Sequence, residues 1–235
     1  MILAIDVGNT NLVLALGSEA GSVDSVWRIS TDAVTAADAC SKAIRKTLGT
    51  KLEEVDNSVI ASVVPAITRH VATAMEGITG RAPLVVGESG VDLGIAVNID
   101  SPEQAGADRV VNAVGAQVHH QLPAVILDFG TATTLDLVGA DGAYEGGIIA
   151  PGVALSIEAL ERAAAQLPKL ELRAFGDDLP VLGKNTVAAM ESGVFWGYVG
   201  MVEGLLTRLR DGYGRSLPAV ATGGLASLLA VHVPS

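Results

Sequence analysis

The 235-residue chain contains few aromatic residues, few basic residues and a single cysteine. Aromatic side chains make up 3% of the sequence, so the platforms on which nucleic-acid bases stack are nearly absent. The 15 lysines and arginines are outnumbered by 26 aspartates and glutamates, and the formal net charge is −11. Because binding to nucleic-acid phosphates requires a basic face, this balance argues against a nucleic-acid-binding protein. The single cysteine, Cys40, cannot form an internal disulfide, which is typical of proteins in a reducing compartment.

The sequence also lacks long apolar segments that are free of charge. No stretch reaches the roughly 18 apolar residues that a membrane-spanning helix needs. The first six residues contain no basic side chain and end at Asp6, so no secretory signal peptide is expected. Hydrophobic residues nevertheless make up 49% of the chain, which is enough for a packed core and excludes a disordered chain. We therefore expect a soluble, cytoplasmic, globular protein without a membrane partner, built of one large domain or two small ones.

Glycine is abundant, and its positions are informative. The 27 glycines include Gly8, Gly130 and the pair Gly223-Gly224, each of which directly follows an apolar, β-like run. A chain that leaves a strand at a glycine can turn tightly and let its backbone approach a ligand closely. Taken singly, each of these glycines is better explained as an ordinary turn.

Two segments about half a chain apart resemble each other. Residues 2–10 (Ile-Leu-Ala-Ile-Asp-Val-Gly-Asn-Thr) align with residues 125–133 (Val-Ile-Leu-Asp-Phe-Gly-Thr-Ala-Thr). Each has an apolar run, then Asp-x-Gly, then hydroxyl or amide residues, and apolar residues resume afterwards, as in a β-hairpin. The repeat predicts an α/β fold of two related lobes, residues 1–117 and 118–235, each opening with strand, turn and strand. Chance similarity between two short motifs is the alternative.

Between and after the two copies, strand-like and helix-like segments alternate. Ser101, Pro102 and Gln104 form a helix-start signal, with serine as N-cap, proline in the first turn and glutamine at the capping-box position. This helix would carry Asp108 and end near His120. We further expect strands at residues 58–64 (ended by Pro65), 83–86 and 219–221, and helices at residues 35–48, 67–75, 155–166 and 186–209.

The two Asp-x-Gly segments have the composition of phosphate-binding hairpins. In the first, glycine would let backbone N–H groups face a ligand, Thr10 and Asn11 would donate hydrogen bonds, and Asp6 would hold Mg²⁺, directly or through water. The second begins at Asp128, so two hairpins from two lobes could face a triphosphate from both sides. The turn at residues 222–224, after the last strand, would let an adenosine lie against the backbone. The three pieces, in this order, favour nucleotide binding.

The adjacent pair Asp108-Arg109 has the chemistry of an acceptor site in a phosphotransferase. Phosphoryl transfer requires donors on the phosphates, a metal and a carboxylate near the acceptor hydroxyl. Asp108 supplies the carboxylate, and Arg109 can bind a substrate carboxylate through two hydrogen bonds. An unperturbed aspartate has a pKa of about 3.9, so Asp108 would orient the hydroxyl and accept its proton late in the transfer. A surface salt bridge at a helix start is the alternative for an isolated pair of this kind.

The helix expected at residues 186–209 carries glycine along one face. Gly193, Gly197, Gly200 and Gly204 follow at i, i+4, i+7 and i+11, and each costs about 1 kcal/mol of helix propensity relative to alanine. A face that accepts this cost usually lets another backbone approach closely. The neighbour would be the same helix of a second subunit, and packing on the chain's own sheet is the alternative.

The order of these motifs resembles the actin, Hsp70 and sugar-kinase superfamily, in which two related, ribonuclease-H-like lobes clamp ATP in the cleft between them. More narrowly, the chain resembles the type III pantothenate kinases over nearly its whole length. The most specific blocks are Gly-Ala-Asp-Arg at residues 106–109 and Asp-Phe-Gly-Thr-Ala-Thr-Thr at residues 128–134. The other matching blocks are residues 6–11, 62–65, 146–152, 184–186 and 222–224.

The resemblance implies ATP-dependent phosphorylation of the primary hydroxyl of pantothenate to 4'-phosphopantothenate, the first step of coenzyme A synthesis. It also implies a divalent cation, a monovalent cation (K⁺ or NH₄⁺) and a homodimer in which the substrate site is completed across the interface. Carried onto this sequence, it implies that Asp108 accepts the proton, that Asp128 binds the monovalent cation and that Thr186 contacts the substrate. Pantothenate would be held by Gly106, Ala107, Asp108 and Arg109, and ATP by Thr131 and by Asp6, Val7, Gly8, Asn9, Thr10, Asn11, Leu12 and Val13.

The sequence departs from the family pattern in two places. Many relatives have a tyrosine that contacts the substrate shortly before Gly106, and this chain has Ile99 there. The Leu-rich segment that usually follows the glycine turn is absent after residues 233–235. Two further functions stay open: phosphorylation of another small alcohol, and a regulatory relative that binds nucleotide without useful turnover. The presence of Asp108 argues against the second, because a protein that only binds nucleotide has no need of an acceptor carboxylate.

Overall fold

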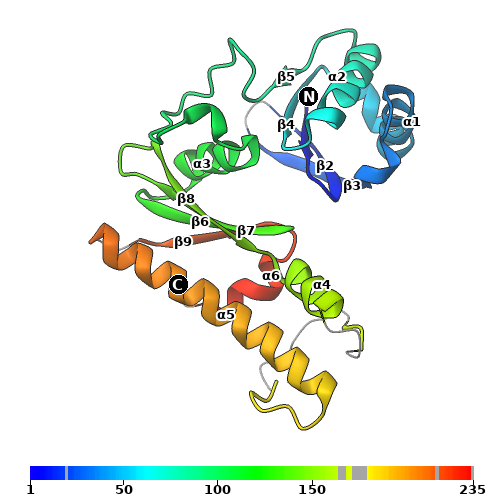
Figure 1. Ribbon diagram of the computed structural model, residues 1–235. Coiled ribbons are helices and arrows are strands. Elements are labelled where there is room, and N and C mark those ends of the chain that lie inside the picture. Colours follow the sequence, from blue (N-terminus) through cyan, green and yellow to red (C-terminus); the bar gives the residue numbers. More distant parts are fainter. Residues whose placement is uncertain (19–20, 164–167, 171–178, 215–216, 234–235) are drawn as a thin grey trace. The chain divides into compact units, whose positions relative to one another are not determined.

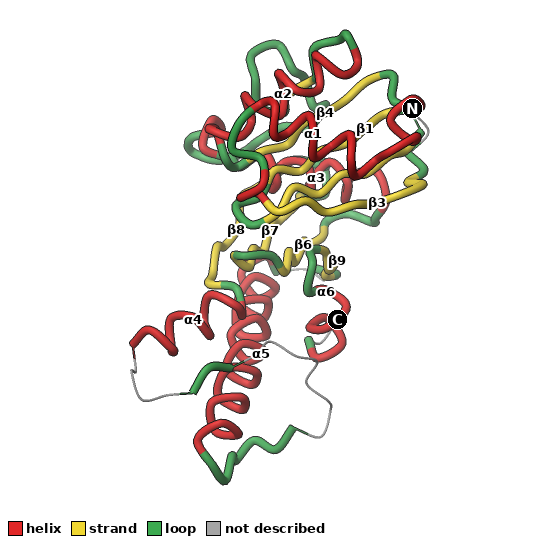
Figure 2. The backbone as a smooth tube through the Cα atoms, turned by 90° about the vertical axis from the view of Figure 1, so that its right-hand side faces the viewer, coloured by secondary structure: helices red, strands yellow, loops and turns green. Residues whose placement is uncertain are grey.

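The computed structural model describes residues 1–18, 21–163, 168–170, 179–214 and 217–233 (Figures 1 and 2). The chain divides into two compact units. The first comprises Met1–Ile95 and Asp100–Val114, and the second comprises Ala96–Ile99 and Gly115–Ser235. Each unit has its own β-sheet and its own hydrophobic core.

The first unit contains a five-stranded sheet in the order β3-β2-β1-β4-β5. In β1 and β2 every second side chain, from Leu3 to Leu16, is buried in a core shared with two helices. The alternation that predicts strands therefore also builds the core. The strands are β1 (Ile2–Val7), β2 (Asn11–Gly17), β3 (Val23–Ser30), β4 (Asn57–Ser62) and β5 (Leu84–Val85); the helices are η1 (Thr31–Ala33), α1 (Ala37–Leu48), η2 (Gly49–Glu54), α2 (Pro65–Thr79), η3 (Pro102–Gln104) and the first turns of α3 (Ala107–His119).

The second unit contains a four-stranded sheet in the order β8-β7-β6-β9. Its long helix α5 runs along one side of the sheet (Figure 2) and buries Phe195, Val199 and Val202 in a core shared with β6 and β7. Such a helix is held by tertiary packing of its apolar side. The strands are β6 (Ala124–Phe129), β7 (Ala132–Val138), β8 (Tyr144–Pro151) and β9 (Ala219–Thr222); the helices are α4 (Val153–Ala163), α5 (Thr186–Tyr213), α6 (Ala226–Leu229) and η4 (Ala230–His232).

The two sheets share one topology, which confirms the predicted repeat. In each, the first strand of the hairpin, β1 or β6, pairs antiparallel with the next strand and parallel with a later one. The third strand, β3 or β8, then pairs antiparallel with the second strand of the hairpin. Asp6 and Asp128 occupy equivalent places near the carboxyl ends of the central strands, opposite Ala61 and Thr222. Both lobes therefore open with the expected strand, turn and strand.

The helix start expected at Ser101 is wrong in its position. Pro102–Gln104 form only a 3-10 turn, and the Ser101 side chain makes no capping hydrogen bond. Helix α3 begins afresh at Ala107. The Arg109 N–H donates to the Gly106 carbonyl oxygen at 3.1 Å, so the helix closes its first turn on that carbonyl instead.

Pro65 begins a helix, whereas the sequence pattern predicts the end of a strand there. Strand β4 ends at Ser62, and Pro65 is the first residue of α2. Proline suits this position because the first N–H groups of a helix have no partner within the helix. The helix expected at residues 67–75 therefore starts two residues earlier and continues to Thr79.

Three other helices differ from expectation at their ends. The helix expected at residues 35–48 is α1, which starts at Ala37. The helix expected at residues 155–166 is α4, which starts at Val153; residues 164–166 lie outside the described residues. The helix expected at residues 186–209 continues to Tyr213. It ends there because Gly214 adopts the left-handed conformation, with φ 67°, that commonly follows a helix.

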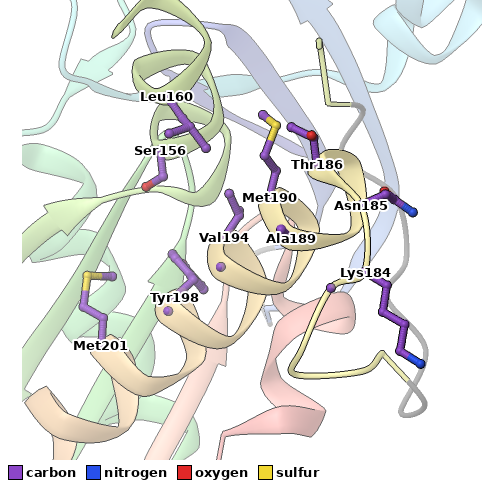
Figure 3. Close-up of a pocket in the computed structure, with 13 residues that line it drawn as sticks. Ser156, Leu160, Lys184, Asn185, Thr186, Ala189, Met190, Val194, Tyr198 and Met201 are labelled. Atoms are coloured by element: carbon purple, nitrogen blue, oxygen red, sulfur yellow. The ribbon is translucent and has the colours of Figure 1, made fainter. Parts of the chain in front are cut away.

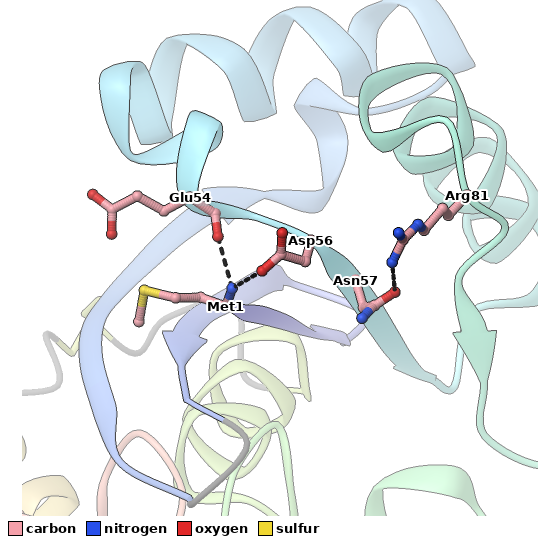
Figure 4. Close-up of polar contacts among 5 residues, drawn as sticks. All are labelled: Met1, Glu54, Asp56, Asn57 and Arg81. Atoms are coloured by element: carbon pink, nitrogen blue, oxygen red, sulfur yellow. Dashed lines mark hydrogen bonds and ion pairs between the residues drawn. The ribbon is translucent and has the colours of Figure 1, made fainter.

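The start of the chain is fixed to the strand beside it (Figure 4). The Met1 amino group donates to the Glu54 carbonyl oxygen at 2.8 Å and forms an ion pair with Asp56. The hydrogen bond that the Met1 amino group donates to the Asp56 carboxylate, together with its positive charge, holds the pKa of that carboxyl below its usual value. The contribution to stability is therefore present above the pKa of the unfolded chain and is lost as the pH falls through the lower folded value. Since Asp56 is exposed, that contribution is small.

Among the described residues, no helix is long and apolar enough to cross a membrane.

Candidate functional site

The first hairpin turn (residues 8–10) connects β1 to β2 in the first unit. The Gly8 N–H donates to the Asn11 carbonyl oxygen at 3.0 Å, which closes the turn. The side chains of Asp6, Asn9, Thr10 and Asn11 are exposed around it. These are the side chains from which phosphate and metal contacts were predicted.

Two of the residues predicted to hold ATP are core residues. Val7 and Leu12 are both 0% exposed, while Val13 is half-buried. Val7 and Leu12 could therefore serve a ligand only through their backbone.

Thr31, which sequence analysis missed, fixes the first hairpin turn from η1. Its hydroxyl donates to the Gly8 carbonyl oxygen at 2.8 Å, and its N–H donates to the Thr10 carbonyl oxygen at 3.0 Å. Thr31 is 7% exposed, so water competes little for these bonds. Two carbonyl groups of the turn, those of Gly8 and Thr10, are thus held by one buried residue.

The second hairpin turn (residues 130–131) connects β6 to β7 in the second unit. It closes in the same way as the first: the Gly130 N–H donates to the Ala132 carbonyl oxygen at 3.1 Å. Asp128 is half-buried and lies opposite Thr134 on β7 and Thr222 on β9. Thr131 is exposed.

The glycine turn (residues 222–224) lies directly against Asp128. Gly223 has a φ of +93°, and a Cβ at this position would overlap Asp128 Oδ1 and lie 2.7 Å from the Phe129 backbone nitrogen. A Cβ on Gly152, just after β8, would lie 2.8 Å from the Gly130 carbonyl oxygen. The absence of side chains therefore lets the glycine turn pack on Asp128 and lets Gly152 pack on the backbone of the second hairpin turn.

A tyrosine from α5 reaches the same place. The hydroxyl oxygens of Tyr198 and Thr133 lie 2.5 Å apart, and both residues are buried. Burial raises the pKa of Tyr198; the hydrogen bond with Thr133 opposes this, and the nearby charge of Asp128 adds to it. Tyr198 therefore stays protonated at neutral pH.

The acceptor turn (residues 106–109) lies in the first unit at the start of α3. Asp108 Oδ1 accepts a hydrogen bond from the Arg109 N–H at 2.9 Å, where the positive end of the helix favours a carboxylate. A Cβ on Gly106 would lie 2.6 Å from the same oxygen. Glycine thus leaves room for the carboxylate to fold back over the helix start.

Ile99 and the acceptor turn belong to different units. Ile99 is half-buried in the short segment Ala96–Ile99, which groups with the second unit. Its Cγ2 lies 3.4 Å from the place where a Cβ on Gly146 would be.

Thr186 is the first residue of α5, and its neighbour Asn185 explains why the helix starts there. The Asn185 side chain accepts a hydrogen bond from the Ala188 N–H at 2.9 Å, the usual role of an N-cap asparagine. Thr186 opens into a groove of about 880 Å³ between α4 and α5 (Figure 3). Ser156 and Leu160 line it from α4, and Met190 and Tyr198 line it from α5.

The glycine face of α5 is open in the described part of the chain. Among these residues, no atom from outside the local helix backbone lies within 4 Å of a Cβ built on Gly193, Gly197 or Gly200. On Gly204 such a Cβ would meet only Arg208, on the same helix, at 3.3 Å. Packing against the chain's own sheet therefore does not explain these glycines.

The donor set fits a hydrated magnesium ion better than a protein-enclosed one. No group of three or more His, Cys, Asp or Glu side chains converges within the described residues. Magnesium usually keeps several waters and takes one or two carboxylates. Asp6 offers one exposed carboxylate beside the first hairpin turn.

The structure thus brings some of the predicted residues together and leaves others in separate elements. Asp128, the second hairpin turn and Gly223 are in direct contact. Local contacts are also described for the other predicted sites, which are the first hairpin turn, the acceptor turn, Ile99 and Thr186. Thr31 and Tyr198 were missed because each acts through a partner that is distant in sequence, and no spacing rule marks such a pair.

Known proteins of one family are similar to this chain over nearly its whole length. The family model described as "Type III pantothenate kinase" matches residues 2–208. The chain is 46% identical over 233 residues to a type III pantothenate kinase of Paramagnetospirillum magneticum, covering 98% of this chain and 88% of that protein. It is 45% identical over 237 residues to one of Rhodospirillum centenum, with coverage of 98% and 89%.

Among solved structures, the chain resembles the activator of the 2-hydroxyisocaproyl-CoA dehydratase from Clostridium difficile, which holds ADPNP. The TM-score is 0.53 at 12% identity, over 98% of this chain and 82% of that one. At this identity the likeness shows the fold alone, which is that of the actin, Hsp70 and sugar-kinase type.

Proposed function

The chain belongs to the type III pantothenate kinase family, and from this premise we propose which of its residues carry the reaction. The reaction is ATP-dependent phosphorylation of pantothenate in coenzyme A biosynthesis. The observation that supports our assignment most strongly is the contact of Asp128 with the glycine turn. It joins two of the three motifs from which nucleotide binding was predicted.

ATP binding rests on the two hairpin turns and the glycine turn. In the first hairpin turn, Thr10 and Asn11 donate to phosphate oxygens, and Asp6 holds Mg²⁺ through water. In the second, Thr131 donates from an exposed position, while Gly223 and Gly224 let the adenosine lie on bare backbone. Magnesium, when bound, neutralises charge that develops on the phosphates.

Thr31→Val tests whether the first hairpin turn must be held in place. Valine keeps the branched shape but removes the hydroxyl that donates to the Gly8 carbonyl oxygen. We expect the KM for ATP to rise about 3- to 10-fold, the equivalent of one neutral hydrogen bond, while Thr31→Ser stays near wild type. Equal KM values for the valine variant and the wild type would remove this role.

Asp128 is proposed to bind K⁺ or NH₄⁺. The Asp128 carboxylate is half-buried and lies against the glycine turn, and carboxylate, hydroxyl and carbonyl oxygens suit a hard cation. We expect turnover that depends on K⁺ or NH₄⁺ and is largely lost in Na⁺ alone. The check is the initial rate in the three chloride salts at equal ionic strength; equal rates would contradict the proposal.

Pantothenate is proposed to bind at the acceptor turn, with further contacts from Ile99 and Thr186. Arg109 would bind its carboxylate, and Asp108 would orient its primary hydroxyl and accept the proton as the phosphoryl group transfers. Asp108 is held in place by the Arg109 N–H. The general base is thus oriented before the substrate arrives.

Phosphorylation of another small alcohol is the remaining alternative for the acceptor. A panel of alcohols that includes pantothenate, pantetheine and simple sugars separates the two functions, because only the true acceptor stimulates ADP release. We expect pantothenate to give the highest kcat/KM. A better sugar substrate would assign the acceptor turn to a different alcohol.

We further propose that the chain is a cytoplasmic homodimer that pairs through the glycine face of α5. Three of the four glycines on this face are open, and Thr186 stands at the start of the same helix. In a two-fold pair, Thr186 of one subunit would complete the pantothenate site of the other.

Mixed dimers test this shared site. Asp108→Asn and Thr186→Phe, each inactive alone, should regain activity when they are unfolded together and refolded. Each heterodimer would have one intact and one doubly damaged site, so a random mixture should recover roughly a quarter of wild-type activity. A monomeric mass in light scattering, or verified heterodimers without activity, would contradict the shared site.

A further inference from the structure

The backbone of the segment Ala96–Ile99 is attached to the start of β8 at Tyr144. The Tyr144 N–H donates to the Ala96 carbonyl oxygen at 2.8 Å, and the Asn98 N–H donates to the Tyr144 carbonyl oxygen at 2.8 Å. The Asn98 side chain also donates to Glu145 Oε1 at 3.0 Å. Two backbone hydrogen bonds thus give this segment a fixed register along β8.

The Tyr144 side chain is itself held by a buried carboxylate. Tyr144 is 1% exposed, and its hydroxyl donates to Asp136 Oδ1 at 3.0 Å. The Thr134 hydroxyl donates to Asp136 Oδ2 at 2.8 Å. Asp136 is 0% exposed, and a carboxylate is retained in such a place only when its oxygens are hydrogen-bonded. The network therefore fixes Tyr144 at both its backbone and its ring.

The Ile99 side chain lies beside Gly146, a residue of the same strand that has no side chain. Gly146 has a φ of +107°, which favours glycine, and Ile99 Cγ2 lies 3.4 Å from the place where its Cβ would be. Tyr144 thus bonds the segment that ends at Ile99, and Gly146, two residues further on β8, faces the Ile99 side chain. The positive φ of Gly146 and its place beside Ile99 therefore explain why the family motif at residues 146–152 begins with glycine. Nucleotide binding does not explain it.

We propose that Asp136, Tyr144 and Gly146 are positioning residues for the acceptor, acting through Ile99. The buried network sets the place of the segment Ala96–Ile99, and the bare backbone of Gly146 lets Ile99 settle on β8. Ile99 then presents a fixed apolar surface to the substrate. The inference rests on the proposed function at one point, the contact between Ile99 and pantothenate.

Tyr144→Phe tests the inference in the full-length chain, with Tyr213→Phe as the matched control. Tyr213 is a half-buried tyrosine at the end of α5, remote in sequence from this network. Without the bond to Asp136, hydrogen exchange at the Asn98 amide should quicken by about tenfold or more, the usual effect of losing a hydrogen bond to a charged group. The KM for pantothenate should rise by about the same factor, while kcat and the KM for ATP stay within about twofold, as expected when only ground-state binding is lost.

Two further variants separate positioning from general loss of stability. Gly146→Ala should also raise the KM for pantothenate alone, because the φ of +107° strains any side chain there and shifts the stretch of β8 beside Ile99. In an Ile99→Ala background, Tyr144→Phe should have little further effect on that KM, since the residue through which it acts is gone. Additive effects would mean that Tyr144 acts by another route and would overturn the inference.

Different results of the exchange and kinetic measurements contradict different parts of the proposal. Unchanged exchange at Asn98 in Tyr144→Phe overturns the anchoring of the segment. Faster exchange with an unchanged KM for pantothenate, or with an equal change in the KM for ATP, overturns the acceptor role. If the wild-type chain does not phosphorylate pantothenate, the proposed function fails and the acceptor role fails with it, and exchange alone then decides the anchoring.

Discussion

Asp108→Asn should reduce turnover roughly 10²-fold or more, the usual effect of losing a general base. Asparagine is nearly the same size and can still accept a hydrogen bond from the Arg109 N–H, so the start of α3 should persist. What it cannot do is take the proton from the pantothenate hydroxyl as the phosphoryl group transfers. The loss should therefore appear in kcat, with the fold and ATP binding preserved.

The measurement for Asp108→Asn is steady-state kinetics combined with ATP titration. An unchanged Kd for ATP and an unchanged midpoint of urea unfolding exclude a general structural effect. A variant that retains near-normal turnover would show that Asp108 is not the base.

Gly223→Ala should destabilise the second unit by about 2–4 kcal/mol, from left-handed strain and overpacking together. The residue has φ +93°, and an added Cβ would overlap Asp128 Oδ1 and crowd the Phe129 backbone. Because the carboxylate has to move, the dependence on K⁺ should weaken as well. Urea unfolding and the K⁺ titration of activity measure the two effects.

The adjacent Gly224→Ala is the matched control. Among the described residues, nothing lies within 4 Å of a Cβ on Gly224, and its φ lies outside the left-handed range. We expect a stability change within about 0.5 kcal/mol, as for an exposed substitution. Equal stabilities of the Gly223 and Gly224 variants would refute the proposed contact between the glycine turn and Asp128.

The parts of the fold that could be predicted are those whose signal lies within a few residues. The two Asp-x-Gly hairpins are local patterns, and because they repeat, they predicted two related lobes. The glycine spacing at residues 193–204 likewise predicted that four glycines share one face of α5, since helical periodicity alone determines which residues share a side.

The errors arise where one local signal has two interpretations. Pro65 can end a strand or begin a helix, and only the buried side of α2 decides between them. Ser101 and Pro102 are residues that often begin an α-helix, but here they begin only a 3-10 turn. Helix α3 instead closes its first turn on the Gly106 carbonyl oxygen. Neither choice is visible without the tertiary packing.

The residues that sequence analysis missed at the site hold other residues in place. Thr31 holds the first hairpin turn from η1, directly after β3, and Tyr198 reaches Thr133 from a helix far along the chain. Asp136 gave no signal in the pattern, because an aspartate in a strand usually faces solvent, whereas here two hydroxyl groups hold it in the core. Such residues carry no motif of their own, so only the folded chain reveals them.

The most direct test of the central claim is the transfer of the γ-phosphate from radiolabelled ATP in the presence and absence of pantothenate. We expect label to appear in 4'-phosphopantothenate in an amount equal to the ADP that is formed. This transfer should need K⁺ or NH₄⁺, and Asp108→Asn should nearly abolish it. Label released as inorganic phosphate at a rate that pantothenate does not change would contradict the assignment of this chain's site to pantothenate phosphorylation.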